Sequence, residues 1–247
     1  MIIRCVVRFK SVLFPLIAYV AVFSLLINLG FWQLDRAEQK RSRLSQQVSA
    51  AEQAPLEITD EVAVVIEDWL FREVSVSGTF EGRQQFLLDN QINKGQPGYF
   101  VLTPFIISGQ KKAVLVNRGW IKANPLRTQL PDVSMVNFKA TITGTLNRFP
   151  SVAIHLKGAE IPTATEPAVV QVVDIAVLSK KIQYPLHDFQ LQLAPKATGG
   201  YFRDWESANK NLMSPEKHQG YALQWFAMAL VLTIICIRIV IKKKKHE

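Results

Sequence analysis

The chain has 247 residues, of which 49% are hydrophobic, and its mean hydropathy is +0.11. This length suffices for one ordinary domain with a buried core, and the apolar excess, concentrated at the two ends, indicates membrane segments. Of the 29 Lys and Arg residues, 8 lie in the two terminal segments 1–10 and 238–247, together with 1 of the 20 acidic residues. This leaves 21 basic against 19 acidic residues in the rest of the chain, which argues against nucleic-acid binding.

The first predicted element is a membrane-spanning helix at residues 11–34. No charged residue occurs between Lys10 and Asp35, and about 20 apolar residues suffice to cross the hydrocarbon core of a bilayer. A cleaved signal peptide is the alternative, since the short tail 1–10 is basic. The apolar run is longer than a signal-peptide core, however, and no small-x-small cleavage site precedes Gly30, so we expect the segment to remain as an anchor.

The helix should continue beyond the membrane until Pro55 ends it. At this junction an aromatic ring, an amide and two cations share one broad helix face at near-helical spacing: Trp32, Gln33, Arg36 and Lys40. Interfacial anchoring by itself accounts for a tryptophan and for cations just outside the bilayer. The combination would also suit a protein partner or an acidic group of a ligand.

Alternation of apolar and polar residues predicts a series of β-strands in the next part of the chain. The strands are expected at residues 71–80, 83–90, 98–107, 111–121 and 138–149. The first two should form a hairpin across Glu81-Gly82, and the next two should form a second hairpin across Ser108-Gly109-Gln110. Pro104 marks a sheet edge or a bulge.

The second predicted hairpin ends in a group of residues that suits either structure or function: Asn117, Arg118, Gly119 and Trp120. A glycine inside a strand suggests a bulge, which would turn Arg118 and Trp120 out of the regular alternation. The residues either stabilise the domain or contact a partner, and the sequence favours neither reading.

The second half of the domain has weaker patterns. Residues 150–168 should be loop, with a short strand as an option, a short helix should open at Asp174, and residues 188–194 should form another strand. Glycine, asparagine and proline accumulate in residues 198–218, as in a linker that leads back to the membrane.

A second membrane-spanning helix is predicted at residues 219–241, followed by the basic tail 242–247. The basic tails at both ends should face the cytoplasm, which puts residues 35–218 on the far side of the membrane. Cations that follow the first span argue for the opposite orientation, but long translocated domains override local charge. The predicted fold class is membrane α + β: two terminal transmembrane helices flank one antiparallel β-rich domain, a barrel or a sandwich, outside the cytoplasm.

Polar and aromatic residues gather where the second span begins: His218, Tyr221, Gln224 and Trp225. Tyr221 and Trp225 are four residues apart and fit an interfacial aromatic belt, whereas Gln224 lies inside the span and needs a polar partner. The neutral imidazole of His218 could ligate haem iron, although such a histidine is more often an ordinary interfacial residue.

Catalytic signatures are missing from the sequence, which contains no GxSxG, GxGxxG, Walker loop, HExxH or CxxC pattern. His187 and Asp188 are adjacent and would point to opposite faces of a strand, so we expect a surface loop there, and the same for His155. Cys5 and Cys236 fall outside the domain, which therefore has neither a disulfide nor a cysteine metal site.

Three segments together resemble the Surfeit locus protein 1 family. They are GFWQLDRAEQK after the first span, LLDNQINKGQPGYFVLTPF followed by VLVNRGWI in the β-rich domain, and PEKHQGYALQWFAMAL entering the second span. The resemblance covers the whole chain in the right order. The residues that match the family only as pattern positions are Trp32, Arg36, Asn117, Arg118, Gly119, Trp120, Tyr221 and Trp225.

The resemblance implies an assembly factor for haem-copper terminal oxidases, principally cytochrome c oxidase, that assists insertion of haem a into subunit I and catalyses nothing itself. Bacterial members are similar in having a histidine near the outer end of the second span that is tied to haem a, which points to His218 as a transient haem a ligand. The haem propionates would suit a cationic rim such as Arg36 or Arg118. The implied partners are oxidase subunit I, haem a synthase and the lipid bilayer.

The ten residues before the first span are too few for a mitochondrial presequence. We therefore expect a bacterial member in the inner membrane, multi-pass, with both termini cytoplasmic and the main domain periplasmic. Two alternatives remain open. One is a scaffold that stabilises an oxidase assembly intermediate without touching haem, and the other is a membrane-anchored envelope enzyme.

Overall fold

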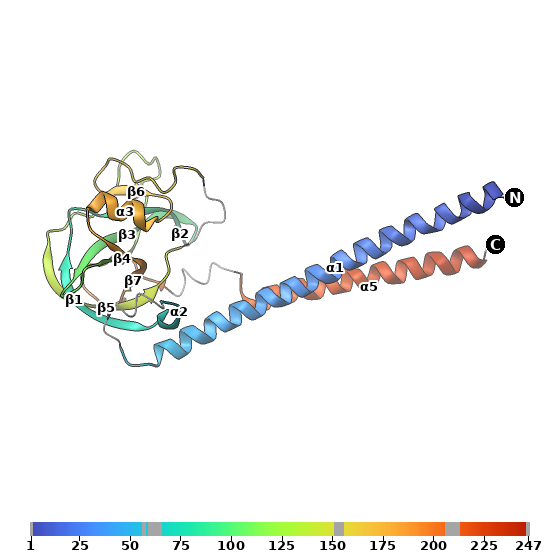
Figure 1. Cartoon of the computed structure of the whole chain (residues 1–247), viewed down its shortest axis with the longest axis horizontal. Coiled ribbons are helices and arrows are strands. Elements are labelled where there is room, and N and C mark those ends of the chain that lie inside the picture. Colours follow the sequence, from blue (N-terminus) through green and yellow to red (C-terminus); the bar gives the residue numbers. More distant parts are fainter. Residues whose placement is uncertain (1, 56–57, 59–65, 151–155, 206–212, 246–247) are drawn as a thin grey trace. The chain divides into compact units, whose positions relative to one another are not determined.

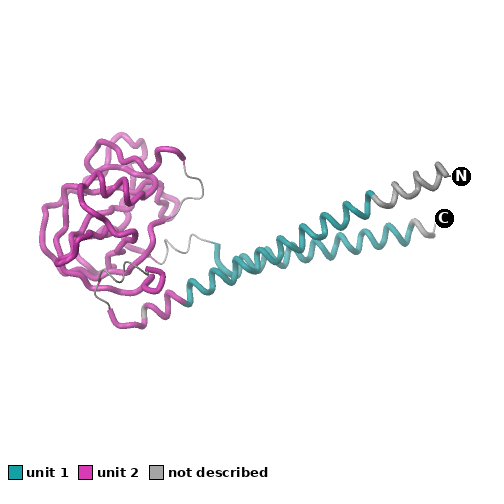
Figure 2. Tube along the Cα trace, viewed as in Figure 1, with its two compact units in different colours: residues 1–45, 210–247 teal, residues 46–209 magenta. Residues whose placement is uncertain are grey.

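The computed structural model describes residues 2–55, 58, 66–150, 156–205 and 213–245. The chain divides into two compact units, which Figure 2 shows in separate colours. The first unit holds residues 1–45 and 210–247, and the second unit holds residues 46–209.

Two long helices make up most of the described part of the first unit (Figure 1). They are α5 (Pro215–Lys245) and α1 (Ile2–Ala51), whose residues 46–51 belong to the second unit. Their segments Phe14–Ala50 and Pro215–Lys242 are long and apolar enough to cross a membrane, since each contains an 18-residue stretch of high mean hydropathy, 2.1 in the first segment and 2.2 in the second. Both predicted terminal helices are therefore present. α1 continues beyond the predicted span as a single helix and ends shortly before Pro55, as expected.

α5 begins earlier than the predicted span because Ser214 and Pro215 form a favourable helix start. Ser214 Oγ accepts a hydrogen bond from the backbone N–H of Lys217 at 3.4 Å. Pro215 occupies the first helical position, where its fixed φ suits the helix and its missing N–H has no partner to lose. Residues 215–218, which the sequence pattern places in the linker, are therefore helical.

The two helices pack through a seam of residues spaced alternately by three and four, as in a coiled coil. On α1 the residues of this seam are buried or half-buried: Tyr19, Phe23, Leu26, Gly30, Gln33, Ala37 and Lys40. A Cβ on Gly30 would collide with the ring of Phe226, so the missing side chain lets this ring reach the α1 backbone. The hydroxyls of Tyr19 and Thr233 add a hydrogen bond of 3.0 Å between the helices.

Among the residues that the structure describes, the second unit contains a seven-stranded sheet and short helices. Its strands are β1 (Glu73–Phe80), β2 (Phe86–Asn93), β3 (Gln96–Ile107), β4 (Ala113–Lys122), β5 (Phe138–Asn147), β6 (Ala168–Val170) and β7 (Leu186–Leu193). The helices are α2 (Ile66–Trp69) and α3 (Ile175–Ile182).

Five of these strands close into a ring. The strand order is β1-β5-β7-β4-β3-β2-β6, and an additional pairing of β1 with β3 joins Gly78 to Ile107 and Phe80 to Phe105. Figure 1 shows the strands curling around one interior. Each ring strand contributes apolar side chains to that core, among them Val76, Phe105, Val116, Ile142 and Leu191. Of the two predicted architectures, the ring corresponds to the barrel.

The prediction of a purely antiparallel domain is wrong, because β4 runs parallel to β7 and β2 runs parallel to β6. Strand direction cannot alternate all the way round a ring with an odd number of members, so a five-stranded ring contains at least one parallel pair. In this ring the pair is β4 and β7. The chain passes from β4 to β7 through β5, β6 and α3, a crossover of the length that parallel neighbours require.

Of the two predicted hairpins, the second is confirmed and the first is wrong. β3 and β4 pair antiparallel across the predicted turn, whereas β1 pairs with β5 and β3, and β2 forms its hairpin with β3. The residues that follow β1 are hydrogen-bonded to β3 and to the residue just before β5. The backbone N–H of Glu81 donates to Pro104 O at 2.9 Å, and that of Gly82 donates to Asn137 Oδ1 at 2.8 Å.

Pro104 lies inside the sheet and not at its edge. β3 changes partner at this point, from β2 at Leu102 to β1 at Phe105, so the missing N–H of Pro104 falls in the gap between the two partners. The predicted helix at Asp174 is confirmed as α3, whose first turn is capped by a 3.0 Å hydrogen bond from Val177 N–H to Asp174 Oδ1. The predicted strand at 188–194 is confirmed as β7.

The contact between Gly30 and Phe226 leads to a prediction about the helix pair. Gly30→Ala should separate α1 from α5, because the added methyl meets the Phe226 ring. Gly220→Ala is the matched control, since Gly220 on α5 has no atom within 4 Å of an added Cβ and alanine favours a helix by about 1 kcal/mol over glycine. We expect Gly30→Ala, but not Gly220→Ala, to slow the formation of an engineered disulfide between the two helices.

The disulfide would join cysteines introduced at Tyr19 and Thr233 in full-length chain whose Cys5 and Cys236 are replaced by serine. Equal rates of disulfide formation in the Gly30→Ala and Gly220→Ala chains would show that this seam is not the packing surface.

Candidate functional site

The first candidate site lies on the helix pair, where the apolar part of each helix gives way to polar residues. Nδ1 of His218 on α5 and Oε1 of Gln33 on α1 are 2.7 Å apart. Because an amide oxygen can only accept, Nδ1 carries the proton and donates it, which leaves the lone pair of Nε2 for another partner. The structure thus joins two residues that the sequence places in separate motifs.

The outer side of α1 at this level carries Trp32 and Arg36. Trp32 is 49% exposed, and the guanidinium carbon of Arg36 lies 5.7 Å from the centre of its ring. Arg36 also donates to Gln39 Oε1 at 2.8 Å, and Gln39 donates to Asp35 Oδ2 at 2.8 Å. Lys40 is half-buried at the helix seam. The predicted face is therefore split, with an exposed ring and cation beside a seam that holds the amide and the second cation.

The residues predicted on α5 differ in exposure. Tyr221 is 43% exposed, Gln224 is exposed and Trp225 is half-buried. Phe226, which the sequence does not single out, packs edge-to-face on Phe31 with ring centroids 5.5 Å apart. Phe226 is thus an aromatic residue that packs between the helices, and a helical-wheel comparison of both spans could have indicated it.

The other predicted residues lie in the second unit, on β4. Arg118 is 6% exposed, so it does not form the cationic rim expected from the sequence. Its Nε donates to Gly199 O at 2.7 Å and its Nη1 donates to Gln85 Oε1 at 2.9 Å. The guanidinium carbon lies 5.1 Å from the centre of the Tyr201 ring. Burial lowers the pKa of the Arg118 guanidinium, and Tyr201 acts in the opposite direction with a smaller effect.

The predicted bulge at Gly119 is confirmed. Trp120 pairs with Phe100 and Asn117 pairs with Leu102, so β4 has one residue more than β3 between these two pairs. Gly119 has a φ of +116°, a region that favours glycine, and its N–H donates to Asn117 Oδ1 at 3.1 Å. The bulge turns Trp120 onto the β2–β3 hairpin.

Residues 199–205 belong to the same cluster, so the predicted linker is wrong for this segment. Trp120 N–H donates to Phe202 O at 2.7 Å and Phe202 N–H donates to Trp120 O at 3.2 Å, which makes an isolated antiparallel bridge. The indole N–H of Trp205 donates to Leu193 O at 3.0 Å. The aromatic run that begins at Tyr201 is the signal that sequence reasoning missed, because solvated linkers contain few aromatic residues.

Arg118 fastens this segment to β4 as well. Besides its bond to Gly199 O, its own carbonyl oxygen accepts from Tyr201 N–H at 2.7 Å. The role that the structure supports for Arg118 is therefore structural: a buried cation, satisfied by neutral acceptors, that holds the chain after β7 against the ring.

The adjacent pair His187 and Asp188 lies in β7, so the prediction of a surface loop is wrong. His187 is 1% exposed and stacks on Phe189 with ring centroids 4.8 Å apart, while Asp188 is exposed. The two side chains do take opposite faces. His155 lies outside the described residues. In the part of the chain that the structure describes, no group of three or more His, Cys, Asp or Glu side chains could hold a metal ion.

The bulge leads to a prediction about stability. A Cβ on Gly119 would lie 2.7 Å from Phe202 O and 2.8 Å from Arg203 Cγ. Gly119→Ala should therefore lower the free energy of unfolding by about 3 kcal/mol, from backbone strain and collision together. Gly109, with a φ of +79° and no atom within 4 Å, is the matched control, and Gly109→Ala should lose only about 1 kcal/mol.

Thermal unfolding of the full-length chain in detergent, followed by near-ultraviolet circular dichroism, measures both changes. Equal losses for the two variants would mean that residues 199–205 do not pack on Gly119.

Known proteins resemble this chain along most of its length. The profile of the SURF1 family matches residues 20–230. A SURF1-like protein of Rickettsia felis is 24% identical over 229 residues, which cover 87% of this chain and 92% of the relative. The cytochrome oxidase assembly protein SHY1 of Saccharomyces cerevisiae is 30% identical over 94 residues, 38% of this chain and 24% of its own length. Because the profile matches residues 20–230, which is most of the chain, the chain belongs to the SURF1 family.

Proposed function

We propose that this chain is an assembly factor for a haem-copper cytochrome oxidase and that it assists the insertion of haem a into subunit I. Family membership and the name of the yeast relative support the role in oxidase assembly. The hydrogen bond between His218 and Gln33 supports the haem step and is the observation on which that step depends. The proposed role is not catalytic.

Haem a would be the cargo at this site, and the residues around His218 fit such a cargo. A histidine that binds a metal ion commonly donates its other N–H to an acceptor, which fixes the ring and its tautomer. Gln33 is that acceptor here, so Nε2 of His218 is the atom that would ligate the haem iron. Trp32 offers an exposed ring for the porphyrin face, and Arg36 offers a cation for a propionate.

The two apolar helices would anchor the chain in a bacterial inner membrane, with both basic tails in the cytoplasm and the β-rich domain in the periplasm. In this topology Trp32 and His218 lie near the periplasmic ends of the predicted membrane spans, at the level where amphipathic haem would partition. Oxidase subunit I would receive the haem, and haem a synthase would supply it.

A scaffold that stabilises an assembly intermediate without touching haem is the second candidate, and family membership supports it equally. For a scaffold, the hydrogen bond between His218 and Gln33 would serve only to hold the two helices together. The two proposals therefore differ in what removal of either side chain does to haem binding.

Haem binding by Gln33 and His218 variants separates the two proposals. Gln33→Ala should weaken haem a binding by roughly 10-fold or more, because the imidazole loses the acceptor that orients it. Gln39→Ala is the matched control, since the Gln39 amide bonds only to Asp35 and Arg36 among the hydrogen bonds of the described residues. His218→Ala should abolish axial ligation.

The measurement is a spectral titration of the purified full-length chain in detergent with haem a. Affinities of Gln33→Ala and His218→Ala that match those of the wild type and of Gln39→Ala would favour the scaffold.

A further inference from the structure

An apolar surface is exposed at the β2–β3 hairpin and beside it. We call this surface the hairpin patch, and its residues are Ile92, Lys94, Phe100, Trp120, Phe202 and Trp205. All but Lys94 line one shallow hollow, together with Asn93 and Asp204. Ile92 is 64% exposed and Phe202 is 46% exposed. Large apolar side chains that adjoin one another on a surface mark a contact site, whereas scattered ones do not.

The patch is preformed, because its indole rings are held by hydrogen bonds at their polar edges. The indole N–H of Trp120 donates to Gln91 O at 2.8 Å, and that of Trp205 donates to Leu193 O at 3.0 Å. The ring of Phe100 lies 5.8 Å from the ring of Trp205. Since both indole N–H groups are used inside the domain, a partner of the patch meets apolar ring surface and little ordering is needed on binding.

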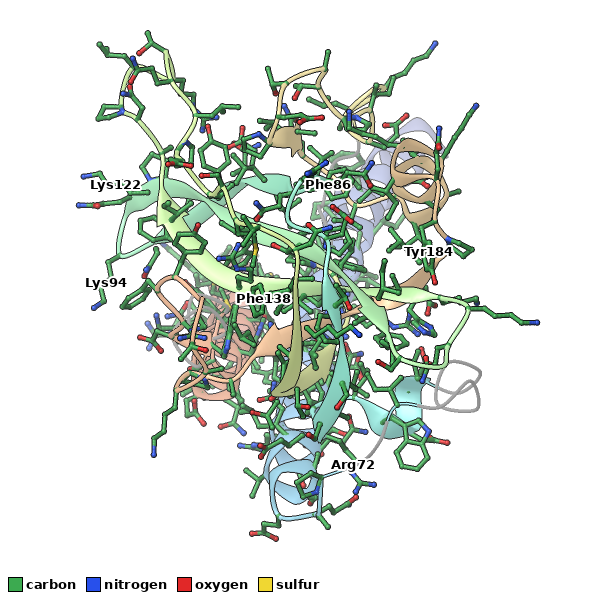
Figure 3. The ribbon with its side chains drawn as sticks, turned by 90° about the vertical axis from the view of Figure 1, so that its left-hand side faces the viewer. Arg72, Phe86, Lys94, Lys122, Phe138 and Tyr184 are labelled. Atoms are coloured by element: carbon green, nitrogen blue, oxygen red, sulfur yellow. The ribbon has the colours of Figure 1, made fainter. Side chains whose placement is uncertain are left out.

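Lysines flank this apolar surface. Lys94 Nζ lies 5.6 Å from the centre of the Phe202 ring, and Lys122, on the neighbouring strand, is exposed. Figure 3 shows Lys94 and Lys122 on the same side of the domain with their side chains directed outward. The two ammonium groups outweigh the carboxylate of Asp204, so the surface is complementary to an anionic partner.

We propose that the hairpin patch docks on the headgroup region of an anionic lipid bilayer. Tryptophan with lysine beside it is the composition of protein surfaces at the membrane–water boundary, where lysines meet lipid phosphates. Lysine is depleted in protein–protein interfaces, where arginine is the preferred cation. The composition of the patch therefore favours lipid over a protein partner.

The chain itself brings a bilayer within reach of the patch. Trp205 precedes Pro215, the first residue of α5, by ten residues. A bilayer that holds α5 is therefore at high effective concentration near the patch. The inference rests on the membrane anchoring that belongs to the proposed function, and the experiment tests that anchoring separately.

Site-directed spin labelling of the full-length chain in vesicles tests the proposal. The chain would carry serine at Cys5 and Cys236 and a single nitroxide at Ile92→Cys, in vesicles of phosphatidylglycerol and phosphatidylethanolamine. We expect this label to lose collisions with a water-soluble nickel complex and to gain collisions with oxygen. Ile161→Cys is the matched control, because Ile161 is also 64% exposed but lies outside the patch, and its label should remain aqueous.

Charge is tested in the same way. Lys94→Gln and Lys122→Gln should each reduce the equilibrium constant for membrane docking, measured with the Ile92 label, by roughly fivefold. Replacing phosphatidylglycerol by phosphatidylcholine should also reduce this equilibrium constant.

A label at Leu25→Cys, on an exposed face of α1, separates failure of the anchoring from failure of the docking. If the Leu25 label lies in hydrocarbon and the labels at Ile92 and Ile161 are equally aqueous, only the docking proposal is overturned. If the Leu25 label is aqueous, the anchoring and the docking both fail. If the Ile92 label is shielded only after purified oxidase is added, the patch binds protein and the lipid proposal is wrong.

Discussion

The closed five-stranded ring is the constraint on which the rest of the β-rich domain depends. An odd ring must contain one parallel pair, and here β4 lies between antiparallel β3 and parallel β7. The pairing with β7 stops at Asn117, so the last residues of β4 have one edge that is not taken by a ring strand. Phe202 pairs with Trp120 at that edge. The bulge at Gly119 and the hydrogen bond from Arg118 to Gly199 O both occur at this junction. This explains why the residues that build the junction lie next to one another in the sequence.

The helix unit depends on a different constraint. In the proposed bilayer, two apolar helices would gain nothing from hydrophobic burial, so their pairing would come from close packing and hydrogen bonds. Gly30 supplies the close packing under Phe226, and Tyr19 with Thr233 supplies one hydrogen bond. The bond from His218 to Gln33 is the second. The same contact therefore stabilises the helix pair and orients the imidazole proposed to meet haem.

Local features could be predicted from the sequence, and pairings between distant segments could not. The bulge at Gly119 and the cap at Asp174 each follow from a residue and its immediate neighbours. The ring does not, because a period of two tells which side chains share a face but not which strand lies alongside. The adjacency of β1 and β2 in sequence therefore led to a wrong hairpin, and the burial of Arg118 was invisible without its acceptors on other segments.

The motif groups of the sequence thus have different roles in the structure. Asn117 to Trp120 build the domain and, through Trp120, the hairpin patch, whereas Gln33 and His218 form the site that we propose for haem. The measurement that tests the central claim most directly is the haem a content of oxidase subunit I in cells whose chromosomal copy of this chain carries His218→Ala at wild-type abundance. The account predicts that subunit I accumulates with as little haem a as in cells that lack the chain. Haem a content equal to that of wild-type cells would contradict it.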